Sequence, residues 1–146
     1  MNSKRKEDFR KRTKQFASSI IRLYCVLPKT RPEVQILGKQ LLRSGTSVAA
    51  NYREASRARS AAEFVSKVET CAQEADETQL WLELLRDDCD INLATVDALW
   101  KESDELIAIF HHGSECEGQA VIPIVSYSSF RSNYPCPNVR TLRKFC

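Results

Sequence analysis

The two histidines, His111 and His112, are the first residues to consider for chemistry, because both metal binding and nucleophilic catalysis commonly use histidine. They are adjacent, and consecutive side chains on a helix point about 100° apart, so the pair cannot face one site. The sequence contains no Glu-x-x-His motif of the kind that binds metals in helical bundles. We therefore predict surface positions near a helix end for both histidines, and no metal site.

Six cysteines are the next candidates: Cys25, Cys71, Cys89, Cys116, Cys136 and Cys146. No two of them form a CxxC pair, and three lie in helical apolar patterns. Residues 1–14 are charged and lack the apolar stretch of a secretory signal, which favours a cytoplasmic protein. Because thiols stay reduced in that compartment, we expect the three helical cysteines to be buried and free.

A carboxylate cluster at Glu74, Asp76 and Glu77 has no histidine partner, so a solvated or ion-paired face is the favoured interpretation. A catalytic use of Glu74 and Glu77 with a histidine is a hypothesis that bound metal would support. The four glycines have no spacing suited to cradling a phosphate, which argues against a nucleotide-binding enzyme. We therefore expect no enzymatic activity, no cofactor and no metal.

Basic residues gather in the first part of the chain. Residues 1–59 hold 15 Lys and Arg against 4 Asp and Glu, a balance of +11, whereas residues 60–106 hold 3 against 13, a balance of −10. Such a charge distribution suits complementary faces within an assembly, a basic surface for nucleic acid, or neutralisation between helices of one bundle. The basic positions are Lys4, Arg5, Lys6, Arg10, Lys11, Arg12 and Lys14 near the N-terminus, and Arg43, Arg53, Arg57 and Arg59 farther on.

Four amphipathic helices are predicted, over residues 8–27, 30–56, 60–88 and 95–112. Their apolar residues recur at steps of three, four and seven. Capping boxes at Thr30 and Ser60 mark two helix starts, and Gly113 is the expected end of the last helix. Small residues interrupt the second stripe at 44–47, which indicates a bend or the close approach of another backbone.

Helices of this length with short connections predict an all-α fold, an antiparallel up-down four-helix bundle over residues 8–113. A basic N-terminal arm, 1–7, precedes it. The stretch 114–146 has no helical period, so we expect an irregular or disordered tail, with a short strand at 121–125 as the alternative. No stretch is long and apolar enough for a membrane span.

One segment resembles a known family. Residues 39–51 (KQLLRSGTSVAAN) continue as 52–55 (YREA) and are followed by 60–64 (SAAEF), 74–78 (EADET) and 80–85 (LWLELL). Together they resemble the bacterial four-helix-bundle family of proteins encoded by intervening sequences in 23S ribosomal RNA genes. The similarity extends over about residues 9–110, and the chain departs from the family pattern after Gly113.

The resemblance implies a ring-shaped homopentamer without known enzymatic activity. A related branch, the accessory variability determinant of diversity-generating retroelements, is a basic pentamer that binds reverse transcriptase and nucleic acid. The positions that match the family pattern are Arg43, Ser47, Asn51, Glu54, Ser60, Phe64, Glu74 and Glu77. We expect structural roles for them, with Ser47 and Asn51 as a polar i, i+4 pair that could fix packing or subunit register.

The resulting hypothesis is a non-enzymatic homo-oligomer that offers a basic surface to RNA, DNA or a nucleic-acid enzyme such as a reverse transcriptase. Its expected phosphate contacts are Arg43, Arg53, Arg57, Arg59, Lys11 and Arg12. The alternative is a protein-binding adaptor that acts through the acidic helix at 60–88, without nucleic-acid contact.

Overall fold

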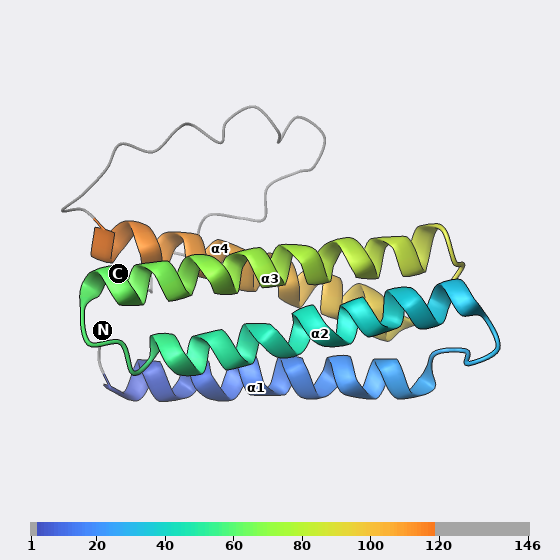
Figure 1. Cartoon of the computed structure of the whole chain (residues 1–146), viewed down its shortest axis with the longest axis horizontal. Helices are drawn as coiled ribbons and strands as arrows, with labels where there is room; N and C mark the ends of the chain where they lie inside the picture. The colour runs from blue at the N-terminus through green and yellow to red at the C-terminus, as the bar shows by residue number, and fades with distance from the viewer. Residues whose placement is uncertain (1–2, 119–146) are drawn as a thin grey trace, which may run out of the picture.

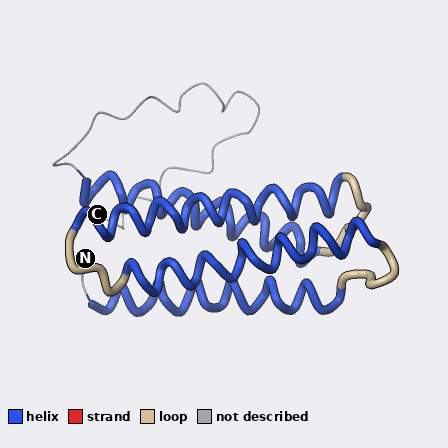
Figure 2. The backbone as a smooth tube through the Cα atoms, in the orientation of Figure 1, coloured by secondary structure: helices blue, strands red, loops and turns tan. Residues whose placement is uncertain are grey.

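The computed structural model describes residues 3–118, which form four helices: α1 (Ser3–Val26), α2 (Pro32–Ala55), α3 (Ala61–Asp87) and α4 (Ala94–Gly118). Figure 1 shows them side by side, with the chain reversing direction at each connection, and Figure 2 shows how short these connections are. α2 packs against α1 and α3, and α3 also packs against α4, whereas contact between α1 and α4 is sparse. The predicted all-α antiparallel up-down bundle is confirmed.

The start of α3 follows the predicted capping pattern. Ser60 has an extended backbone, and its hydroxyl accepts a hydrogen bond of 3.1 Å from the backbone N–H of Glu63. The Glu63 carboxylate in turn accepts from the backbone N–H of Arg59 at 2.8 Å. The Ser60 hydroxyl thus satisfies one donor that the helix start leaves unpaired, while the Glu63 side chain binds the residue before the cap.

The predicted cap of α2 at Thr30 is wrong. Arg31 is the N-cap residue, no side chain caps the helix there, and Pro32 occupies the first turn as expected. The Arg31 guanidinium instead donates to the Glu33 carboxylate and to the backbone carbonyl of Cys89, each at 2.7 Å. The second of these bonds ties the start of α2 to the α3–α4 connection.

Two other boundaries differ from the prediction. α1 begins at Ser3 rather than at Asp8, because Lys, Arg and Glu are good helix formers and Arg10 pairs with Glu7 one turn earlier, at 3.2 Å. α4 continues past Gly113 to Gly118, since a glycine inside a helix costs only about 1 kcal/mol relative to alanine. The rest of the predicted tail, 119–146, with its candidate strand at 121–125, lies outside the described residues.

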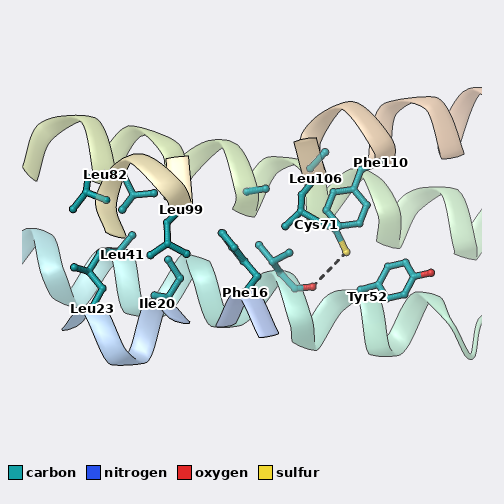
Figure 3. Packing of buried hydrophobic residues seen from close by; sticks show 14 of the residues in the cluster. Phe16, Ile20, Leu23, Leu41, Tyr52, Cys71, Leu82, Leu99, Leu106 and Phe110 are labelled. Atoms are coloured by element: carbon teal, nitrogen blue, oxygen red, sulfur yellow. Dashed lines mark hydrogen bonds between the residues drawn. The ribbon is translucent and has the colours of Figure 1, made fainter. Parts of the chain in front are cut away.

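The core runs along the length of the bundle, and Figure 3 shows side chains from all four helices interlocking in it. Gly45 explains the small-residue segment of α2. A Cβ atom added at Gly45 would lie 2.8 Å from Cγ1 of Ile20 on α1, well inside van der Waals contact. The close approach of α1, one of the two predicted reasons, therefore accounts for the glycine in this segment.

Buried polar groups link neighbouring helices in this core. The hydroxyls of Ser44 on α2 and Thr78 on α3 are 2.9 Å apart, and Ser103 on α4 donates to the carbonyl of Ala75 on α3 at 3.3 Å. Buried hydrogen bonds of this kind favour one axial position of each helix against the next.

Among residues 3–118, no helix is long and apolar enough to span a membrane.

Candidate nucleic-acid interface

The up-down topology brings separate parts of the sequence to one end of the bundle. The first turns of α1, the last turn of α2, the α2–α3 connection and the last turns of α4 all lie at the end where the N-terminus is marked in Figure 1. The two basic clusters of the sequence, near the N-terminus and around residues 53–59, therefore lie partly on the same end. We refer to Lys6, Arg53, Arg57 and Arg59 as the basic end.

Three arginines dominate the basic end. Arg53 lies in the last turn of α2, where a positive charge is favourable beside the helix carboxyl terminus, and Arg57 and Arg59 follow in the connection. All three side chains are exposed, and their guanidinium groups form no ion pair with residues 3–118. Unpaired, exposed guanidinium groups at a bundle end can bind phosphate oxygens at no cost in existing interactions.

Two carboxylates close in sequence to these arginines, one on α2 and one on α3, have partners of their own. Glu54 accepts a hydrogen bond from Lys67 at 2.5 Å, which joins α2 to α3. Glu63 accepts from the backbone of Arg59 at the helix start. On α1, Lys6 lies 5.6 Å from the centre of the Phe64 ring, so its cationic group rests on the first turn of α3.

An aromatic cluster supports this end from within. The Phe9 ring centre is 4.9 Å from that of Tyr52 and 5.6 Å from that of Phe110, both in edge-on arrangements. These contacts hold the first turns of α1 against α2 and α4. The Tyr52 hydroxyl is buried and has no hydrogen-bond partner within the described residues, and burial raises the pKa of its phenol.

Arg12, a predicted phosphate contact, is paired with carboxylates of α4 in the structure. Its guanidinium donates to Glu102 at 2.6 and 2.9 Å and to Glu105 at 2.6 Å, across the sparse α1–α4 seam. Hydrogen bonding to Glu102, the main cause, raises the pKa of the Arg12 guanidinium. This side chain joins two helices, and it also lines a groove of about 380 Å³ in that seam.

Two other predicted phosphate contacts are not among the residues of the basic end. Arg43 is exposed on α2, ten residues and therefore roughly 15 Å of helix before Arg53, beside Glu74 of α3. Lys11 is exposed on the outer side of α1. The structure thus brings together Arg53, Arg57 and Arg59 from the predicted set, and adds Lys6.

The polar positions shared with the family are placed on α2 and α3. The Asn51 amide donates to the backbone carbonyl of Ser47 at 3.0 Å, so the predicted side-chain pair does not form. The buried interhelical hydroxyl pair is Ser44–Thr78 instead. Both members lie in the family-like runs 39–51 and 74–78. Each is on the apolar face of its helix, and this position was the sequence signal that could have identified the pair.

The acidic cluster is divided between environments. Glu74 is half-buried, and burial, reinforced by the nearby charge of Glu77, raises the pKa of its carboxyl group against the opposing effect of Arg43. Glu77 and Asp76 are exposed. Within the described residues, no group of three or more His, Cys, Asp or Glu side chains is arranged to hold a metal ion.

Fold and site together define a small four-helix-bundle protein with hydrogen bonds between its buried helix faces and a basic end formed by two helices and a connection. The chain belongs to the 23S rRNA-intervening sequence protein family, whose model matches residues 5–112. This confirms the resemblance seen in residues 39–85.

A solved structure agrees with this assignment. The chain is 33% identical to a protein of unknown function from the S23 ribosomal protein family of Bacteroides thetaiotaomicron. The match covers 75% of this chain and 97% of that one, with a TM-score of 0.68. A comparison with curated proteins found no match.

Proposed function

We propose that the protein is a non-enzymatic, self-assembling helical bundle, a homopentamer by analogy with the family, whose basic end binds the phosphate backbone of RNA or DNA. The observation that carries the proposal is the convergence of Arg53, Arg57 and Arg59, unpaired and exposed, with Lys6 at one end of the bundle. Contacts of guanidinium and ammonium groups with phosphates give affinity that depends on salt but little on sequence.

An RNA ligand is the first to test, since the family's name refers to an intervening sequence of 23S rRNA. A nucleic-acid enzyme such as a reverse transcriptase is a second class of partner. Such an enzyme would bind the same oligomer and act on the nucleic-acid strand that the basic end holds.

Binding is tested by fluorescence anisotropy of labelled structured RNA and duplex DNA over a range of salt concentrations. The triple variant R53E/R57E/R59E should bind about tenfold or more weakly at moderate salt. The slope of log affinity against log salt should become shallower by roughly one for each phosphate that the variant no longer neutralises.

The matched control is K29E/K39E/K101E, which makes the same change in net charge at exposed positions away from the basic end. Its affinity should stay closer to that of the unmodified protein. Equal losses in the two variants would mean that net charge alone attracts the nucleic acid, and the basic end would not be the site.

A second candidate function is supported by the exposed acidic face of α3, which includes Glu69, Asp76 and Glu77. A protein acting through this face would bind a basic partner and show no nucleic-acid affinity even at low salt. Absence of RNA and DNA binding in the anisotropy experiment would therefore favour this adaptor function over the first.

A further inference from the structure

The acidic face of α3 contains a straight strip of charges. Glu69, Asp76 and Asp87 are all exposed and are separated by 7 and 11 residues. The eighteen residues from Glu69 to Asp87 make five turns of about 3.6 residues, and the seven from Glu69 to Asp76 make nearly two turns. The three carboxylates therefore lie along one line on the helix. At about 1.5 Å per residue, this acidic strip is roughly 27 Å long.

A basic strip with the same spacing lies on α1. Lys4, Lys11 and Arg22 are exposed and are also separated by 7 and 11 residues. The same helical geometry places their side chains on one line of the same length. Arg22 donates to Ser19 one turn earlier, at 3.1 Å, which leaves its charge on the outer side of the helix.

The two strips cannot meet within one chain. α1 and α3 do not pack against each other along their lengths, and the contact of Lys6 with the Phe64 ring joins them only at the basic end. They run in the same direction, because the chain reverses once between α1 and α2 and again between α2 and α3. A second copy placed alongside, with its bundle axis parallel, can therefore set its α1 against this α3 in parallel orientation.

We propose that the basic strip on α1 of one copy binds the acidic strip on α3 of a second copy. In a single parallel register, Lys4 faces Glu69, Lys11 faces Asp76 and Arg22 faces Asp87. The inference rests on the self-assembly in the proposed function and deepens it by naming the two surfaces that join the subunits.

The strips are different surfaces, so the contact is head-to-tail rather than self-complementary. A pair of copies therefore still presents one strip of each sign, and addition of copies continues until the rotation between neighbours closes a ring. Matched charge spacing fixes the register between subunits, and juxtaposed like charges disfavour the shifted alternatives. The arginines of the basic end belong to neither strip.

Lys11 and Asp76 are the best pair to test, because neither forms an ion pair with another residue of the described part of the chain. Asp87, by contrast, already pairs with Arg86 at 2.7 Å. The experiment is sedimentation velocity on the full chain over a range of concentrations, with K11E, D76K and the charge swap K11E/D76K. K101E, an exposed change on α4, is the control.

Each single reversal should raise the concentration needed for assembly by about tenfold or more, because attraction is replaced by repulsion at every interface. The double swap should restore assembly, since opposite charges then face each other again at every interface, with their signs exchanged between α1 and α3. K101E should assemble as the unmodified protein does. Recovery in the double swap cannot result from misfolding of the single variants.

Two results would overturn the inference in distinguishable ways. If the unmodified protein is a monomer at every concentration, the proposed self-assembly fails together with the interface. If the unmodified protein assembles but K11E and D76K assemble equally well, or the swap restores nothing, the subunits join through other surfaces. RNA binding at the basic end would be unaffected by the second result.

Discussion

Replacement of Gly45 by alanine should destabilise the bundle, although alanine is the better helix former. Within a helix, alanine is favoured over glycine by about 1 kcal/mol. The new methyl group would lie 2.8, 3.0 and 3.3 Å from Cγ1, Cγ2 and Cβ of Ile20. Ile20 is fully buried and branched at Cβ, so these atoms cannot rotate away. Overpacking typically costs about 1–3 kcal/mol, and we expect a net loss of roughly 1 kcal/mol.

Gly38 is the matched control on the same helix. A Cβ atom there would meet Cδ1 of Leu27 at 2.9 Å and Cδ2 of Tyr24 at 3.2 Å. The Leu27 atom is the end of a flexible side chain that can shift at little cost. Gly38→Ala should therefore leave the free energy of unfolding unchanged, or raise it by up to about 1 kcal/mol.

The two variants are compared by urea unfolding, followed by far-UV circular dichroism at one protein concentration, because assembly makes stability concentration-dependent. In an Ile20→Ala background, Gly45→Ala should change sign and stabilise, which gives a coupling energy of about 2 kcal/mol. If Gly45→Ala stabilises the unmodified protein as much as Gly38→Ala does, α1 and α2 are not in the close contact on which this reasoning depends.

Three further outcomes are expected. Burial raises the pKa of Glu74, so its ionised form destabilises the folded state. Glu74→Gln should therefore raise the free energy of unfolding at neutral pH, and this gain should disappear as the pH falls below the ordinary carboxyl pKa of 4.5. Urea unfolding at several pH values measures the gain, and a gain independent of pH would contradict the reasoning. Cys25 is exposed, contrary to the expectation that all three helical cysteines are buried, whereas Cys71 is buried and burial raises the pKa of its thiol to about 12. Peptide mapping after brief alkylation at about pH 8 should therefore find Cys25 modified well before Cys71, and equal labelling would refute the burial of Cys71. Arg12→Met should lower the free energy of unfolding, measured in urea, by about 1 kcal/mol, because it leaves the half-buried Glu102 without its partner. Arg12→Met combined with Glu102→Gln should recover part of that loss. No change in the single variant would show that the ion pair contributes nothing to stability.

Local rules predicted much of the fold from the sequence. The apolar steps of three and four located all four helices, and Ser60 capped α3 as its capping box indicated. The N-cap of α2 is Arg31 rather than Thr30, and the Arg31 side chain bonds to the carbonyl of Cys89, which is 58 residues away in the chain. A contact at that separation leaves no signal in the local pattern.

The site was predicted less well, because charge in a sequence does not identify the neighbours of a side chain. Arg12 has the same local setting as Lys11, but Glu102 and Glu105 of α4 lie beside it and neutralise it. Successive residues on a helix differ by about 100° in direction, so choosing Ser47 rather than Ser44 for the buried pair depended on the rotation of α2. That rotation is set by packing against α1 and α3.

The central claim is that nucleic acid binds at the basic end. The most direct test is photo-crosslinking of a structured RNA containing 4-thiouridine to the assembled protein, with the linked peptides identified by mass spectrometry. Crosslinks should be concentrated in residues 53–59 and the first turns of α1. Crosslinks confined to the α2 surface around Arg43 or to α4 before its last turns, or no crosslinks at low salt, would contradict it.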